Sequence, residues 1–259
     1  MIAYQDKKEL IPEGKYLFSV TQIQQFFNNP NEFFRKVIRK ETIPFNSNQT
    51  ALGTLIHYAI SQMYDKKEVE QKEINDYLNS IDDIDRIWVI SKYNEMKDDV
   101  LNNVKGISLD YPTEWEKSYT LQLSDNVYIG GTIDVRYDNL LLDFKTSSKL
   151  TLKKEDELPQ KYIDQLYTYS YILHHNGVAI DKCGICYFTI PEVNRTSLIT
   201  GKRMKDYPMQ FFIKDFYLQA DYLTTIQKRL FLIAESIEYV LKNQDTFYLF
   251  ARDYDLKAK

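Results

Sequence analysis

The chain has 259 residues, a formal net charge of −4 at pH 7, and apolar and charged fractions of 44% and 27%. This length allows one large domain with a full hydrophobic core, and the ordinary composition excludes an intrinsically disordered chain. The negative charge argues against a protein that holds nucleic acid through overall basicity. It leaves room for a site that binds divalent cations, because such a site must itself gather carboxylates.

Targeting signals and cysteines limit where the protein works. No stretch approaches the roughly 18 apolar residues that span a bilayer, and the first residues do not form a secretory signal. We therefore expect a cytoplasmic protein with no membrane partner. Cys183 and Cys186 are the only cysteines, which suits a reducing compartment and excludes a metal cluster held by four cysteines.

Helical periodicity dominates residues 1–110. The expected helices cover residues 22–28, 31–40, 51–64, 69–79 and 84–104. Ser19 or Thr21 is placed to cap the first of them, since a hydroxyl before a helix accepts a hydrogen bond from its first turn. In the third, apolar side chains recur every three or four residues and form one buried stripe, with His57 at its edge.

Beyond residue 110 the pattern changes to the alternation that is typical of strands. The expected strands cover residues 115–123, 127–137, 140–146, 183–190 and 209–216. The turns between the first three are short, which predicts an antiparallel meander. A helix over residues 159–174 ends at the stop signal Asn176-Gly177, a loop covers 193–207, and an amphipathic helix over 218–241 follows.

No internal repeat, low-complexity run or flexible linker marks a domain boundary. We therefore expect one domain over residues 1–259, with a mainly helical part at 1–110, an αβ core at 111–190, and a loop, strand and helix at 191–259. The expected fold class is α+β: a mixed sheet that contains the antiparallel meander, flanked by helices, with an N-terminal helical segment along one side.

Charged side chains interrupt the third strand of the meander. In Leu140-Leu141-Leu142-Asp143-Phe144-Lys145, strand alternation sends Asp143 and Lys145 to the same face, which is costly unless they are solvated, paired or bound to a ligand. A two-residue turn allows Asp134 on the preceding strand to lie across from Asp143. Two such carboxylates repel each other unless a cation lies between them, so they predict a site for Mg²⁺ or Mn²⁺. We expect all three charged side chains to face solvent.

Ordered motifs give the sequence a resemblance to a known family. Gly131-Thr132-Ile133-Asp134 and Asp143-Phe144-Lys145 resemble the G-x-(I/V)-D and (D/E)-x-K motifs of the PD-(D/E)XK nucleases. Gly53-Thr54-Leu55-Ile56-His57 resembles the G-T-x-x-H helix of the RecB-like branch, and Gln165 with Tyr169 matches its Q-x-x-x-Y motif. The likeness covers residues 18–169 in the family's order and spacing, and it implies a restriction-endonuclease-like core.

The resemblance also implies the chemistry of the site. It assigns metal binding to four residues: His57, Asp134, Asp143 and, through its carbonyl, Phe144. It assigns catalysis to Asp134, Asp143 and Lys145, and Glu116 joins them because many members carry a Glu at this place on the first strand. The implied cofactors are two Mg²⁺ or Mn²⁺ ions, and a His ligand shifts the preference toward Mn²⁺.

The function that the resemblance implies is a metal-dependent deoxyribonuclease. We expect an exonuclease that hydrolyses phosphodiester bonds of single strands or DNA ends in recombination, replication or repair, in the host-cell cytoplasm if it is phage-encoded. Its expected partners are DNA and a recombination or replication protein, and some relatives form oligomers. Two alternatives remain open: a structure-specific or CRISPR-adaptation-type endonuclease, and a non-catalytic DNA-binding subunit.

Several residues outside the catalytic motifs are candidates for DNA contacts. Gln165 and Tyr169 share one helix face. One interpretation places them near the substrate backbone or an active-site water, and the other gives them only a packing role and a surface amide. Lys149, with two further lysines after the catalytic strand, is placed to contact phosphate. The basic cluster of Lys202, Arg203 and Lys205 falls in the predicted loop, where such runs more often form a solvated face.

One departure from the family concerns iron. Many members hold an iron-sulfur cluster with a Cys just before the equivalent of Pro30 and three more near the C-terminus, but Asn29 stands at the first position here. Cys183 and Cys186 lie three residues apart on a predicted strand, so their side chains should point to opposite faces. We therefore expect no iron-sulfur cluster.

Overall fold

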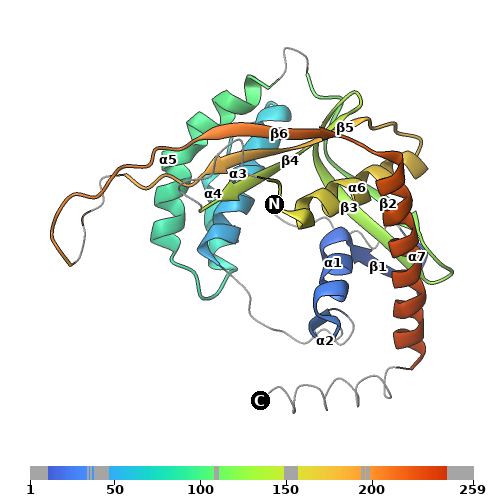
Figure 1. Cartoon of the computed structure of the whole chain (residues 1–259). Helices are drawn as coiled ribbons and strands as arrows, with labels where there is room; N and C mark the ends of the chain where they lie inside the picture. The colour runs from blue at the N-terminus through green and yellow to red at the C-terminus, as the bar shows by residue number, and fades with distance from the viewer. Residues whose placement is uncertain are drawn as a thin grey trace.

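A mixed six-stranded sheet forms the centre of the molecule, with helices on both faces (Figure 1). The computed structural model describes residues 11–33, 35, 37, 47–107, 111–148, 157–193, 196 and 199–243. The strands are β1 (Tyr16–Ser19), β2 (Glu114–Gln122), β3 (Val127–Tyr137), β4 (Leu140–Ser147), β5 (Lys182–Thr189) and β6 (Phe211–Tyr217). The helices are α1 (Val20–Asn28), α2 (Pro30–Phe33), α3 (Asn48–Tyr64), α4 (Gln71–Asn79), α5 (Arg86–Lys105), α6 (Gln160–His175) and α7 (Ala220–Lys242).

Strand alternation divides the apolar side chains between two cores. On one face the sheet packs against α1, α6 and α7, and on the other against α3, α4 and α5. Leu141 and Leu142 are neighbours in β4 and enter different cores. Cys183 and Cys186 divide in the same way, and both are fully buried, so the predicted opposite orientation of the two thiols is confirmed.

The predicted meander is present, but β3 changes partners along its length. On one side it pairs with antiparallel β2. On the other side its first residues, Val127 to Gly130, pair with parallel β1, and its last three, Val135 to Tyr137, pair with antiparallel β4. The predicted ladder pair of Asp134 and Asp143 therefore does not form, because β3 and β4 part between Val135 and Asp134.

Most predicted helices are confirmed with small changes at their ends. Ser19 caps α1 in a capping box: its Oγ accepts from the backbone N–H of Gln22, while Gln22 Oε1 accepts from the backbone N–H of Ser19. The helix predicted over residues 31–40 is described only in part, as α2 and residues 35 and 37. The short strand β1 was not predicted.

The structure also bears on the ends of α6 and on membrane insertion. Gly177 follows α6 with φ of +77°, a left-handed conformation that favours glycine, as the Asn-Gly stop signal predicts. Within the described part of the chain, no helix combines the length and apolar character that a bilayer crossing requires.

Candidate active site and metal centre

His57 reaches the sheet from the edge of the buried stripe of α3. Ser47 caps this helix by accepting a hydrogen bond from the backbone N–H of Thr50. Leu55 and Ile56 are buried on the core side, which leaves the half-buried imidazole of His57 facing β4. Its Nε2 lies 3.0 Å from the carbonyl oxygen of Phe144, within hydrogen-bond distance.

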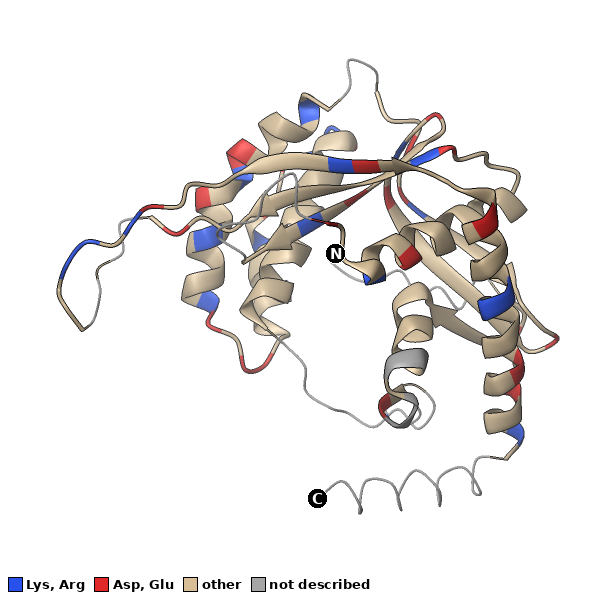
Figure 2. Ribbon diagram, viewed as in Figure 1, with Lys and Arg blue, Asp and Glu red and all other residues tan. Residues whose placement is uncertain are grey.

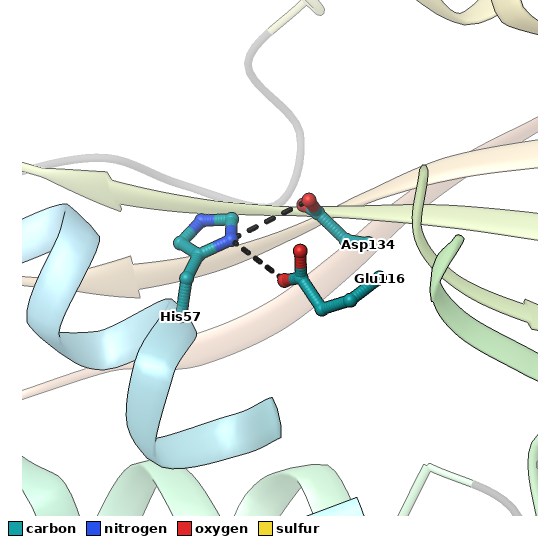
Figure 3. Close-up of side chains that lie close together, drawn as sticks. All are labelled: His57, Glu116 and Asp134. Carbon is teal, nitrogen blue, oxygen red and sulfur yellow. Dashed lines mark ion pairs between the residues drawn. The ribbon is translucent and has the colours of Figure 1, made fainter. Parts of the chain in front are cut away.

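Two carboxylates approach the other nitrogen of His57 (Figure 3). Nδ1 lies 3.4 Å from Oδ1 of Asp134 on β3 and 3.9 Å from Oε1 of Glu116 on β2. The nitrogen and the two oxygens that could hold a metal ion all lie within 4.8 Å of one another. Asp134 is fixed in addition by Oδ2, which accepts a hydrogen bond of 2.6 Å from the backbone N–H of Phe144.

Glu116 has an unusual backbone conformation for a strand residue. Its φ is +46°, in the left-handed region that a side chain with a Cβ rarely adopts. Both neighbouring residues are held in the sheet, because Trp115 pairs with Val135 and Lys117 pairs with Ile133 of β3. The strained conformation is therefore maintained at a residue whose carboxylate faces His57.

The second half of the site is built on β4 and α6. Asp143 is 5% exposed, so the expectation that it faces solvent is wrong: α6 covers this face of the sheet. Its Oδ2 lies 2.6 Å from Nζ of Lys145 in an ion pair, and its Oδ1 accepts a hydrogen bond of 3.3 Å from Gln165 on α6. Asp134 and Lys145 are also less open than expected, with side chains 12% and 24% exposed.

Tyr169 lies one helical turn after Gln165 and presses against the backbone of β3. A Cβ built on Gly131 would lie 2.2 Å from Cε1 of Tyr169, a distance that no real contact allows. Gly131 is therefore needed so that the ring can enter the site. This explains in physical terms why the motif that ends in Asp134 contains a glycine here.

The charges of the site perturb one another. Burial would raise the pKa of Asp134, but the charge and hydrogen bond of His57 lower it below its ordinary value. Burial would lower the pKa of His57, but Asp134 and Glu116 raise it well above 6.5. Burial raises the pKa of Asp143 to about 6, against the opposing charge of Lys145. The charges of Asp143 and Asp134 raise the pKa of Lys145 despite its burial.

These groups line one cavity of about 1150 Å³. Its walls come from the polar side of α3, from α4, from strands β2 to β4, and from Gln165 and Tyr169 of α6. His57, Glu116, Asp134 and Asp143 all line this cavity and offer one imidazole and three carboxylates, which is a donor set suited to Mg²⁺ or Mn²⁺. The residues present therefore fit a divalent metal ion.

The structure brings most of the predicted site residues together. His57, Glu116 and Asp134 form one group, and Asp143, Lys145 and Gln165 form a second group on the same cavity wall. Lys149 lies outside the described residues. Sequence reasoning missed Tyr58, which lines the cavity beside His57, although Thr50, Thr54 and Tyr58 recur every four residues along one side of α3.

Comparison with known proteins gives a family and a fold. A family model described as the PD-(D/E)XK nuclease superfamily matches residues 17–247. No curated protein matches the sequence. Among solved structures, a proposed exonuclease from Eubacterium rectale is similar with a TM-score of 0.58 and 12% sequence identity, over 93% of this chain and 88% of that one. At this identity the likeness shows a shared fold.

Two further solved structures are more distant. An alkaline exonuclease from Laribacter hongkongensis is 13% identical, with a TM-score of 0.38 over 78% of this chain and 94% of that one. A phage-related exonuclease from Haemophilus somnus 129PT is 14% identical, with a TM-score of 0.39 over 89% of this chain and 96% of that one.

Proposed function

The chain belongs to the PD-(D/E)XK nuclease superfamily, and from this premise we propose that it is a divalent-metal-dependent deoxyribonuclease that removes nucleotides from DNA ends. The observation that carries the proposal is the meeting of His57, Glu116 and Asp134 within 4.8 Å, beside the ion pair of Asp143 and Lys145. Both groups line one cavity.

The proposed metal ligands come from four separate elements. His57 on α3, Glu116 on β2 and Asp134 on β3 would hold the ion, and Asp143 on β4 would complete the set. The Phe144 carbonyl lies against Nε2, on the other side of the imidazole from these carboxylates, so it would orient the ring. Bound Mg²⁺ or Mn²⁺ supplies polarisation of the phosphodiester and a lower pKa for an attacking water. The proposed site binds two such ions.

Lys145 has a different task from the carboxylates. Asp143 and Asp134 keep its ammonium charged, since they raise its pKa. A charged ammonium at the cavity wall can orient the attacking water and offset the negative charge that builds on the phosphate oxygens in the transition state. Lys145 is therefore the residue whose loss should reduce the rate most directly.

Gln165 and Tyr169 are proposed to position the reacting groups. Gln165 donates to Oδ1 of Asp143 and so fixes the orientation of that carboxylate relative to Lys145. Tyr169 lines the cavity next to Gly131, where it can contact the backbone of a bound strand. The proposed setting is recombination, replication or repair in the cytoplasm of a cell or of a phage-infected host.

The proposal is tested by cleavage of DNA labelled at the 5′ or the 3′ end. Single- and double-stranded substrates are incubated with Mg²⁺, Mn²⁺ or EDTA, and the wild type is compared with Lys145→Ala and with Lys228→Ala, a control that removes an exposed lysine of α7. We expect metal-dependent release of mononucleotides or short products by the wild type and the control, and loss of this release in Lys145→Ala.

Other outcomes would favour the alternatives. Internal fragments without early release of either end label would indicate an endonuclease. DNA binding without cleavage in any metal would indicate a non-catalytic subunit. Normal cleavage by Lys145→Ala would show that the proposed site is wrong.

A further inference from the structure

A hairpin arm extends the sheet beyond the last residues of β5. The chain leaves β5 at Thr189 and returns to β6 at Phe211, and two isolated antiparallel bridges, Glu192 with Tyr207 and Thr196 with Arg203, join the two limbs. Figure 1 shows this hairpin in orange, reaching outward past α5. We name residues 199–207, at its outer end, the basic arm.

The basic arm concentrates positive charge on an acidic protein. Lys202, Arg203 and Lys205 are all exposed, and Asp206 is the one acidic residue among them (Figure 2). Arg203 pairs with Asp206 at 2.6 Å yet keeps 68% of its side chain exposed. Lys205 lies over the ring of Tyr207, with 5.4 Å between Nζ and the centroid. Exposed cations beside an aromatic ring match the chemistry of a sugar-phosphate backbone.

The register of the sheet relates the arm to the active site. In the parallel pair of β4 and β5, Lys145 lies opposite Tyr187 and Ser147 lies opposite Thr189. The backbone N–H of Ile190 then donates to the carbonyl of Ser147 at 2.8 Å. The arm therefore leaves the sheet at the same end of β4 as Lys145.

The base of the arm is fixed, which limits where its tip can lie. Nζ of Lys92 on α5 donates to the carbonyl of Pro191 at 2.6 Å. From Tyr187 to Ile199 an extended chain spans at most about 40 Å, at ~3.3 Å per residue. At ~3.4 Å per base pair this distance corresponds to about 12 base pairs of duplex.

We propose that the basic arm binds the phosphate backbone of a DNA substrate outside the cavity, up to about 12 base pairs from the bond that is cleaved. This inference rests on the proposed function, because it assumes that the cavity holds a DNA strand. Lys202 and Lys205 contact phosphates, and the arm lengthens the surface that holds the substrate. Its contribution is to affinity for long substrates and not to the chemical step.

The test compares two double variants that each remove two positive charges. Lys202→Ala/Lys205→Ala changes the arm, and Lys105→Ala/Lys228→Ala changes exposed lysines of α5 and α7. Cleavage is measured on a duplex of about 30 base pairs and on one of about 6 base pairs, lengths set on either side of the estimated reach. Binding of the long duplex is also measured in EDTA across a range of salt concentrations.

We expect the arm variant to raise KM for the long duplex on the order of tenfold at low salt, with kcat unchanged. Its salt dependence should weaken, because the slope of log K against log[salt] falls by about 0.9 for each lost phosphate contact. Cleavage of the short duplex should be the same in both variants. An equal effect on long and short duplexes, or no effect on either, would overturn the proposal.

Two further measurements separate this proposal from its alternatives. Ile199 and Met204 are also exposed on the arm, so light scattering is used to compare the mass of the arm variant with that of the wild type. A change of mass without any dependence on duplex length would assign the arm to a protein contact and overturn the proposal. If the wild type cleaves nothing, the proposed function fails, while binding in EDTA still decides whether the arm holds DNA.

Discussion

Asp134 accepts a hydrogen bond from the backbone N–H of Phe144 at the place where β3 and β4 stop pairing. A side chain thus replaces the ladder bond that the next backbone pair would have made. The carbonyl of the same Phe144 lies 3.0 Å from His57, so one residue of β4 links the strand and helix halves of the site. Because β3 and β4 separate here, the carboxylate of Asp134 can approach the imidazole of His57.

Metal binding should stabilise the fold through this group. Mn²⁺ at about 100 times its Kd should add about 2.7 kcal/mol to the free energy of unfolding, because the ion binds the folded state alone. Asp134→Ala should lose most of this gain, and EDTA should abolish it in the wild type. Thermal unfolding with and without Mn²⁺ measures the effect, with the exposed turn variant Asp125→Ala as control. Equal metal-induced shifts in Asp134→Ala and wild type would contradict the assignment.

Glu116 should be a site where glycine is better tolerated than alanine. Alanine keeps the cost of a positive φ, whereas glycine adopts +46° freely, so Glu116→Gly should be more stable than Glu116→Ala by roughly 1 kcal/mol. Urea denaturation of the two variants measures the difference. At the next residue, Lys117, the order should reverse, since φ there is not positive. The same order at both positions would show that Glu116 is not strained.

Gly131→Ala should damage the fold and the activity together. The new methyl group would overlap the ring of Tyr169, and the displacement should cost about 1–3 kcal/mol. In Gly131→Ala/Tyr169→Ala the overlap is gone, so the double variant should lose less stability than the two single variants combined. A double-mutant cycle in denaturant measures this coupling. Strict additivity would mean that the ring and the glycine do not touch.

Glu238 should contribute a stability that depends on pH. The hydroxyl of Ser124 and the backbone N–H of Asn126 donate to its carboxylate and lower its pKa, which ties α7 to the turn between β2 and β3. A lowered folded-state pKa gives a stabilisation that is fully present above the ordinary Glu value of about 4.3 and is lost as pH falls through the lowered value.

Glu238→Gln should therefore unfold at a lower denaturant concentration than the wild type at pH 7. The two proteins should converge as pH falls below about 4. A difference that stays constant between pH 7 and pH 3 would argue that the charge of Glu238 plays no part.

The sequence predicted the elements with local signals and missed those that depend on distant contacts. The ends of β3 follow from alternation and two short turns, and α1 follows from the hydroxyl of Ser19. The strand β1 has only four residues, and its identity comes from pairing with Val127 to Gly130, more than a hundred positions away. No local pattern marks such a strand.

The same distinction holds within the site. Alternation placed Asp143 and Lys145 on one face, but it could not show that α6 covers that face and buries Asp143. The ordered motifs named His57 and Asp134, whose meeting depends on how α3 packs on the sheet. The turn of Glu116 toward His57 relies on a positive φ at a residue that rarely adopts one, and the sequence carries no signal for it.

The two cysteines give the protein a pair of built-in reporters. Cys183 is buried in the core that packs against α6, and Cys186 is buried in the core that packs against α3. Burial raises the pKa of both thiols. A thiol reagent can reach each one only when its own side of the sheet opens. In Cys186→Ala and Cys183→Ala variants, labelling rates would thus report separately on the breathing of the two layers, and would reveal whether the layer that holds His57 opens before the layer that holds Gln165.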